Sequence, residues 1–117
     1  ETDGQLHAII LDPELENLVE SRIIETVDGE MLSLEAMERE QIRAHTSEKL
    51  TELRAAGHKS VVLCRSEIRR HLWKLLETRV PGLTVLAYEE VGEDIKVELH
   101  GTVDKEMVPV NSEALQE

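Results

Sequence analysis

The thiol of Cys64 is the side chain of this sequence best suited by type to nucleophilic chemistry. It ends an apolar run that starts at Val61, and Arg65 and Ser66 follow it, so we expect it between a strand and a helix. A helix N-terminus and a nearby arginine both favour the reactive thiolate. Nucleophilic catalysis also needs a general base and an oxyanion site, which the sequence does not mark. A structural thiol is the favoured interpretation, and a small thiol-dependent enzyme or redox protein using Cys64 is the alternative.

The histidines could ligate a metal ion, but they are spread along the chain. No two of them have the helical spacing that places two ligands on one face, and a second cysteine for a Cys-x-x-Cys pair is absent. We therefore predict neither a metal site nor a cofactor, and no catalytic residue. The histidines are His7, His45, His58, His71 and His100.

Two charged sets are the candidate partner-binding residues. One is an acidic turn, and the other is a basic island in an otherwise acidic chain. Carboxylates in a water-exposed turn lack the cleft that separates pKa values for acid–base catalysis. Arginine is favoured at interfaces where charged pairs are partly desolvated. The candidates are Glu89, Glu90, Glu93 and Asp94 in the turn, and Arg65, Arg69 and Arg70 in the island.

The composition limits the class of partner. The chain has 117 residues and a formal net charge of -12. Nucleic acids and anionic membranes attract cationic proteins, so this charge argues against both and permits a basic protein partner. A single cysteine favours a cytosolic compartment. No window approaches the roughly 18 apolar residues of a membrane span, and the first residue is not Met, so we expect a soluble fragment of a larger protein without direct membrane contact.

The elements that must position these residues begin with four predicted strands. Continuous apolar runs predict strands over residues 5–11, 60–64 and 83–88, and alternation of apolar and polar residues predicts one over 95–103. The second and third of these strands, joined by a helix, should form a right-handed parallel crossover. The last two strands are close enough in sequence to form a hairpin, although the sequence does not prove that they pair.

Capping residues and apolar stripes predict three helices. Asp12 and Pro13 start the first. Ser33 can cap a long second helix that ends at Gly57, and Ser66 can cap the third. The predicted fold class is α/β, a small mixed sheet of about four strands with three helices, in the order β-α-α-β-α-β-β.

The chain divides into three parts by composition and periodicity. Residues 1–4 are interpreted as a linker from a larger chain, and residues 5–103 as a single α/β domain. Residues 104–117 lack periodicity, and we expect them to be a disordered C-terminal tail.

Four stretches, in order and at suitable spacing, resemble one protein family. They are Leu11-Asp12-Pro13-Glu14-Leu15-Glu16, Gly57 to Leu63 followed by Ser66-Glu67-Ile68-Arg69, Pro81 to Val91, and Val97 to Val103. Together they resemble the C-terminal end of the FlhA, LcrD and InvA family of type III secretion export-gate proteins, over about residues 6–103. The Gly101-Thr102-Val103 ending is more similar to the flagellar branch, with the injectisome branch as the alternative.

The resemblance implies a non-enzymatic protein-binding module of the export gate. The complete family protein carries an N-terminal membrane domain and a cytoplasmic domain that forms a nonameric ring at the inner membrane. This chain resembles the last cytoplasmic subdomain. The implied partners are the coiled-coil export stalk, chaperone–substrate complexes and neighbouring subunits of the ring. Tyr88-Glu89-Glu90 would then be a fold signature and not a catalytic cluster.

Overall fold

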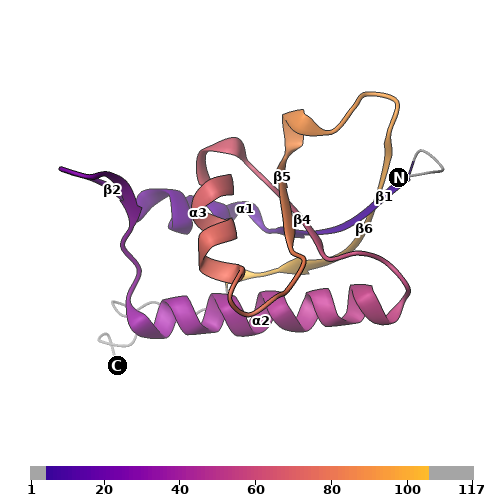
Figure 1. The fold of residues 1–117 in the computed structure, drawn as a ribbon, viewed down its shortest axis with the longest axis horizontal. Coiled ribbons are helices and arrows are strands. Elements are labelled where there is room, and N and C mark those ends of the chain that lie inside the picture. Colours follow the sequence, from indigo (N-terminus) through magenta and orange to yellow (C-terminus); the bar gives the residue numbers. More distant parts are fainter. Residues whose placement is uncertain (1–4, 106–117) are drawn as a thin grey trace.

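Parallel strands form the central sheet of the part of the chain that the computed structural model describes, residues 5–105. Their spatial order is β5-β4-β1-β6 (Figure 1). The strands are β1 (Gln5–Leu11), β4 (Val61–Cys64), β5 (Thr84–Ala87) and β6 (Lys96–Val103). Strand β4 is buried along its whole length, as expected for a parallel strand that is covered on both faces.

Three α-helices, in the part of the chain that the structure describes, pack against one face of this sheet. They are α1 (Pro13–Ser21), α2 (Ala36–Ala55) and α3 (Ser66–Leu76). The long helix α2 runs below the sheet in Figure 1. The main core joins alternate residues of the strands to the apolar stripes of all three helices. Its members include Ile9, Leu11, Leu15, Val19, Ile42, Leu50, Val62, Ile68, Leu72 and Leu76.

The opposite face of the sheet is covered by the connection from β5 to β6. This connection starts with the short 3₁₀ turn η1 (Tyr88–Glu90). Its Val91 and Ile95 pack on a second cluster that contains Leu6, Ala8, Val61 and Leu63. Strands β5 and β6 are the two edges of the sheet, so the expectation that they could form a hairpin is wrong. The connection is a parallel crossover that passes over β4 and β1.

A two-stranded antiparallel ribbon, which was not predicted, follows α1 and precedes α2 in the sequence. It consists of β2 (Ile23–Thr26) and β3 (Gly29–Leu32). Ile23 continues the apolar spacing of α1 in the sequence, but it is the first residue of β2. The turn leaves Val27 fully exposed, and Gly29 after it takes the positive φ of 108° that glycine adopts without strain.

The predicted helix ends are partly confirmed. Asp12 Oδ1 accepts the N–H of Leu15 at 2.8 Å, which is the expected N-cap of α1. Helix α2 ends at Ala55, its C-cap is Ala56, and Gly57 follows in the left-handed conformation, as predicted for a C′ glycine. It begins at Ala36 and not after Ser33, because the Glu38 carboxylate accepts the Glu35 N–H at 3.0 Å and closes the first turn there.

The predicted fold class, a small α/β domain of about four sheet strands and three helices, is confirmed for residues 5–105. The sheet was expected to be mixed; within residues 5–105 its four strands are all parallel, and the antiparallel pairing lies in the separate β2–β3 ribbon. Residues 1–4 and 106–117 lie outside the described residues, so the linker and most of the predicted tail are not tested. Where the predicted tail begins, the Lys105 N–H donates to Asp12 Oδ2 at 3.0 Å. In the described range, no helix combines the length and the apolar character that crossing a membrane demands.

Candidate functional site

Cys64, the predicted candidate nucleophile, is fully buried at the end of β4. Burial, and next the charge of Glu16, raise the pKa of its thiol to about 12, although Arg69 acts against them. Because the thiolate is the reactive form, a thiol with this pKa is almost entirely protonated at neutral pH. The surroundings of Cys64 therefore favour the structural interpretation over the thiol-enzyme alternative.

The buried carboxylate of Glu16 joins three segments of the chain. Its Oε2 accepts the backbone N–H of Arg65 at 3.0 Å and lies 3.4 Å from the Tyr88 hydroxyl. Its Oε1 lies 3.5 Å from Arg65 Nε. Burial, and next the Glu16 charge, raise the pKa of Tyr88 to about 12, so its hydroxyl remains a donor. These contacts assign Glu16 and Tyr88 to the scaffold.

Arg65, from the predicted basic island, holds α3 against α1. Its Nη1 donates to Glu20 Oε1 at 2.7 Å and to Asn17 Oδ1 at 2.9 Å. The hydrogen bond to Glu20 is the main reason why the pKa of Arg65 is raised. A partner would have to compete with these contacts, so Arg65 is poorly placed to bind one.

Arg69 and Glu90 bring the two predicted sets into contact. Arg69 Nε lies 3.6 Å from Glu90 Oε1, and the same oxygen accepts the N–H of Ala87 at 2.7 Å. Both side chains of the ion pair are more than two-fifths exposed, so it contributes little to stability. The basic island and the acidic turn are therefore adjoining parts of one surface.

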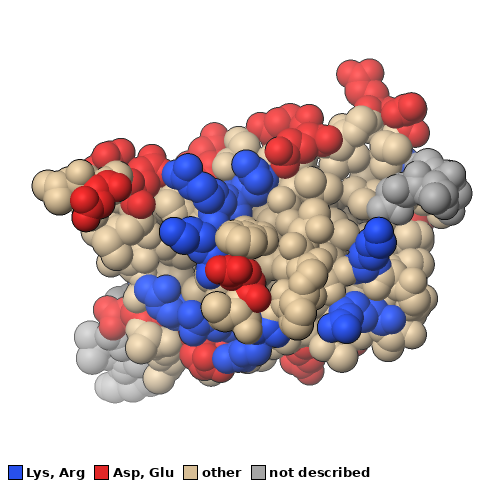
Figure 2. Space-filling view, in the orientation of Figure 1, with Lys and Arg blue, Asp and Glu red and all other residues tan. Residues whose placement is uncertain are grey.

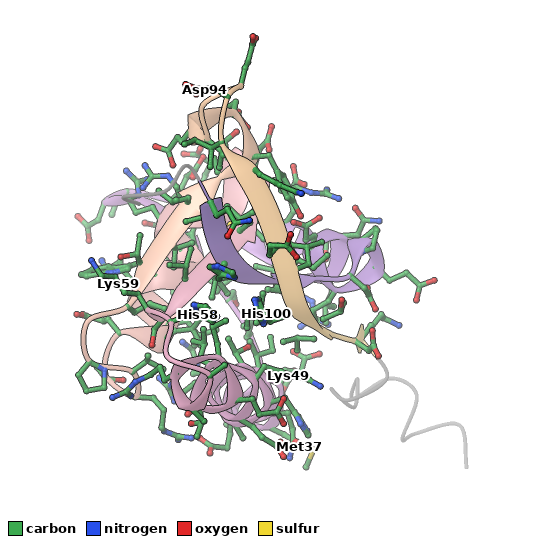
Figure 3. The ribbon with its side chains drawn as sticks, turned by 90° about the vertical axis from the view of Figure 1, so that its right-hand side faces the viewer. Met37, Lys49, His58, Lys59, Asp94 and His100 are labelled. Carbon is green, nitrogen blue, oxygen red and sulfur yellow. The ribbon has the colours of Figure 1, made fainter. Side chains whose placement is uncertain are left out.

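The remaining carboxylates of the predicted turn point into solvent. Glu89, Glu93 and Asp94 are exposed, and among residues 5–105 none of them forms an ion pair. Acidic side chains line the upper edge of the molecule in Figure 2, and Figure 3 places Asp94 near the tip of the β5–β6 connection. We call Glu89, Glu93 and Asp94 the acidic tip.

A basic groove lies between α2, α3 and the β2–β3 ribbon. It consists of two adjoining hollows of about 500 Å³ each, which share Glu30, Arg70 and His71. Figure 2 shows Lys and Arg side chains gathered over α3 and the adjoining part of α2. The cations that line the groove are Arg39 and Arg43 from α2, and Arg69, Arg70 and Lys74 from α3, and its carboxylates are Glu20, Asp28, Glu30 and Glu67.

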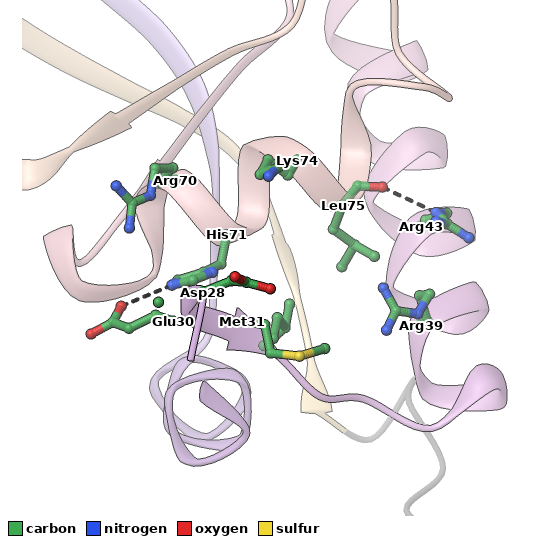
Figure 4. A pocket seen from close by; sticks show the side chains of 11 residues that line it. Asp28, Glu30, Met31, Arg39, Arg43, Arg70, His71, Lys74 and Leu75 are labelled. Atoms are coloured by element: carbon green, nitrogen blue, oxygen red, sulfur yellow. Dashed lines mark hydrogen bonds and ion pairs between the residues drawn. The ribbon is translucent and has the colours of Figure 1, made fainter. Parts of the chain in front are cut away.

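Two contacts between neighbouring elements shape this groove (Figure 4). Arg43 Nε donates to the carbonyl oxygen of Leu75 at 3.0 Å, and His71 Nε2 lies 3.1 Å from Glu30 Oε1 on the ribbon. The structure gives the side chains of Arg39, Arg70 and Lys74 no ion-pair partner within residues 5–105. Their charges can therefore meet an anionic group of a partner, such as a carboxylate.

Sequence reasoning found Arg70 but missed Arg39, Arg43 and Lys74. A signal was present, because Arg39 and Arg43 are four residues apart on one helix, and Arg70 and Lys74 are four apart on another. Such pairs share a helix face. Only the fold shows that the two faces border the same groove.

Comparison with known proteins identifies relatives of this chain. The FHIPEP family model matches residues 1–96. Low calcium response locus protein D of Yersinia pestis is 30% identical over 98 residues, which are 84% of this chain and 14% of that protein. Invasion protein InvA of Salmonella typhimurium is 31% identical over 101 residues, 86% of this chain and 15% of that protein. Flagellar biosynthesis protein FlhA of Treponema pallidum is 30% identical over 99 residues, with corresponding shares of 84% and 14%. The chain thus spans about a seventh of the length of these curated relatives.

Solved structures share the fold. The crystal structure of the C-terminal domain of InvA superposes with a TM-score of 0.74 at 28% identity, covering 84% of this chain and 30% of that one. The cryo-EM structure of nonameric EPEC SctV-C gives a TM-score of 0.67 at 27% identity, covering 85% of this chain and 29% of that one.

Proposed function

We propose, since this chain belongs to the FHIPEP family, that it is a non-enzymatic protein-binding module of a type III protein export gate. The observation that carries the proposal is the family match over residues 1–96, on a domain whose fold matches 30% of the InvA C-terminal domain. The burial of Cys64 supports the absence of thiol catalysis. The exposed charges of the acidic tip and the basic groove support a role in binding proteins.

The module would be the last cytoplasmic subdomain of a longer membrane protein, with residues 5–103 as one structural unit. The small share of each relative that the chain covers supports this. The solved EPEC SctV-C structure is a nonamer. We propose that this chain contributes to a nonameric ring as well. The ring would lie at the cytoplasmic side of the inner membrane. We place it in the flagellar apparatus on the basis of the Gly101-Thr102-Val103 ending. An injectisome homologue is the alternative, because relatives from both branches match about equally.

The two charged surfaces suit different partners. The acidic tip would attract a basic or mixed-charge helical partner, which we propose to be the coiled-coil export stalk. The basic groove would accept an acidic segment of a neighbouring subunit of the ring. Chaperone–substrate complexes are further candidate partners of the assembled gate. Electrostatic attraction of this kind acts mainly on the association rate and weakens with salt.

The structure changes which of the predicted residues should be mutated. Arg65 and Glu90 hold backbone or ion-pair contacts inside the domain, so reversing their charge would disturb the fold. Glu89 with Asp94, and Arg70 with Lys74, are exposed and can be reversed in pairs. Matched controls are Glu52→Lys and Arg54→Glu, at exposed positions near the end of α2.

The experiment introduces each pair of charge-reversing substitutions, and each control, into the chromosomal gene of the bacterium from which the chain comes. Exported protein in the medium and flagellar motility are measured, and purified variants are checked for folding by circular dichroism. Deletion of the gene should abolish export. If export continues without it, the export-gate proposal is wrong. Loss of motility assigns the flagellar branch, and loss of another exported protein with intact motility assigns the injectisome.

The surfaces are tested separately with purified proteins. Glu89→Lys with Asp94→Lys should weaken binding to the stalk protein of the same system, and added salt should weaken binding of the unmodified chain. Arg70→Glu with Lys74→Glu should instead impair association of the subunits. If export needs the gene but neither double variant differs from its control in binding, the export-gate proposal stands and the proposed electrostatic role of the two surfaces is wrong.

A further inference from the structure

Three histidines that are far apart in the sequence meet where the sheet approaches the end of α2. His7 lies on β1, His58 lies between α2 and β4, and His100 lies on β6. Within residues 5–105, these three form a group whose candidate ligand atoms all lie within 4.8 Å of one another. Figure 3 shows His58 and His100 side by side next to α2. The histidines that are scattered in the sequence are thus partly gathered by the fold.

The rings are in direct contact. His7 Nδ1 and His100 Nε2 are 2.8 Å apart. The rings of His7 and His58 are stacked, with centroids 3.7 Å apart and an angle of 13° between their planes. The His58 and His100 centroids are 4.9 Å apart. Each imidazole thus contacts both others.

The backbone fixes the position of His58. Gly57, with a φ of +93°, reverses the chain after α2. The Gly57 N–H donates to the Arg54 carbonyl at 2.9 Å, and the His58 N–H donates to the Leu53 carbonyl at 3.2 Å. This is the double hydrogen bond of a Schellman motif. It sets His58 at the end of α2 independently of the other two rings.

A β-bulge fixes the position of His100. Ala8 pairs with Leu99 and Ile10 pairs with Thr102, so His100 and Gly101 stand opposite the single residue Ile9. Bulges of this kind redirect a side chain, and they are frequent next to functional sites. Gly101 suits the place, because a Cβ there would come within 3.3 Å of the Lys49 side chain. The bulge therefore sets His100 beside His7.

The donor set fits a borderline-soft transition metal ion. Imidazole nitrogens are good ligands for Zn²⁺, whereas Mg²⁺ and Ca²⁺ require oxygen ligands. Zn²⁺ sites with three histidines leave a fourth position for water or another ligand. His7 and His58 border a hollow of about 170 Å³ that Gly57, Lys59 and Val61 also line, which is ample for a water molecule of about 30 Å³. The net charge of -12 also favours a cation near the chain.

We infer that His7, His58 and His100 form a binding site for a divalent late first-row transition metal ion, of which Zn²⁺ is the type. Coordination at the Zn–N distance of about 2.0–2.1 Å requires the stacked rings of His7 and His58 to turn out of their parallel arrangement, so that their nitrogens point at one ion. The ion replaces the hydrogen bond between His7 and His100. It links the end of α2 to β1 and to the edge strand β6. This site is independent of the acidic tip and the basic groove.

The test uses the whole 117-residue chain, free of any histidine tag and stripped of metal. Zn²⁺ binding is measured by calorimetry, and Co²⁺ is added in parallel because its visible absorption reports the number and type of its ligands. We expect one equivalent to bind, with a tetrahedral Co²⁺ spectrum and a higher thermal unfolding temperature in the presence of Zn²⁺.

Single variants identify the ligands. His7→Gln, His58→Gln and His100→Gln should each weaken Zn²⁺ binding at least tenfold. The matched control His45→Gln, on α2 and bonded to Gln41, should bind like the unmodified chain. His100 is exposed, so its variant remains informative if the others fail to fold. Weak binding of several equivalents that His100→Gln leaves unchanged, or no Zn²⁺ binding at all, would overturn the inference.

Discussion

The backbone N–H of Arg65 donates to Oε2 of Glu16 at 3.0 Å, across 49 residues of sequence. The acceptor lies on α1 and is 5% exposed, and the donor precedes the first turn of α3. A carboxylate at the N-terminus of a helix is stabilised by the helix dipole. The Tyr88 hydroxyl lies 3.4 Å from the same oxygen. One carboxylate thus connects the first and third of the stretches that carry the family resemblance with the residue immediately before Ser66.

Replacing Glu16 should therefore destabilise the domain. Glu16→Ala removes a charge-assisted acceptor and should cost about 1.5–3 kcal/mol, whereas Glu16→Gln should cost less because it keeps an acceptor. Urea unfolding followed by circular dichroism measures the change. Glu14→Gln, an exposed position in the same turn of α1, is the control and should stay within about 1 kcal/mol. Equal effects of Glu16→Ala and the control would refute this role.

The buried ion pair of Glu38 and Arg22 should contribute more to the free energy of unfolding than a similar ion pair on the surface. Glu38 is 1% exposed, accepts two hydrogen bonds from Arg22 and also accepts the Glu35 N–H. Glu38→Ala leaves a mostly buried guanidinium without its partner and should cost about 3–5 kcal/mol. The comparison is Glu40→Ala.

Glu40 makes a pair with Arg79 at 2.9 Å in which both side chains are well exposed. Its loss should cost at most about 1 kcal/mol. Thermal unfolding of the two variants under the same conditions gives the contrast. Similar unfolding temperatures would mean that burial of Glu38 does not set the strength of its pair.

Asp12 should make stability depend on acid pH. Burial raises the pKa of Asp12, but hydrogen bonds from the N–H groups of Leu15, Lys105 and Glu14 outweigh burial and hold it below its ordinary value of 3.8. Since the pKa is lower in the folded chain, the stabilisation is present above pH 3.8 and is lost as pH falls through the folded value. Asp12→Asn should flatten the decline in stability below pH 4. An unchanged decline would contradict this assignment.

Cys64 should be unreactive while the chain is folded. Burial is the main cause of its pKa of about 12, so at neutral pH a thiol reagent should label it only when the chain unfolds. Labelling is measured by mass spectrometry with and without urea. Cys64→Ala should also leave binding of the stalk protein unchanged. Rapid labelling of the folded chain at neutral pH would revive the thiol-enzyme alternative.

The core of this domain could be predicted because its periodicity is strong. Ile68, Leu72, Leu75 and Leu76 follow helical spacing, and all are buried on α3. The β2–β3 ribbon could not be separated from α1 in the same way, since Ile23 continues the spacing of Leu15 and Val19 and most of the ribbon is exposed. The Asp28-Gly29 turn signal was present, but strands of four residues with solvated faces carry little pattern.

The sites depend on distances that a sequence does not contain. Arg70 could be selected by its type, but its groove requires two helices and a ribbon to come together. The histidine cluster draws on β1, β6 and the end of α2, and no local spacing links them. Sequence motifs for metal sites depend on ligands that are close together in one element, so they do not reveal His7, His58 and His100.

The central position of β1 has a consequence for how the domain forms during translation. β1 is made first, yet its two neighbours, β4 and β6, are made 50 or more residues later. A nascent chain therefore holds β1 with both edges unpaired until β4 emerges from the ribosome, and with one edge unpaired until β6 follows. Contacts so distant in sequence slow folding, and unpaired strand edges invite pairing with other chains. A ribosome that stalls before Lys96 would release a chain prone to aggregation, and complete synthesis of β6 is the event that closes the domain.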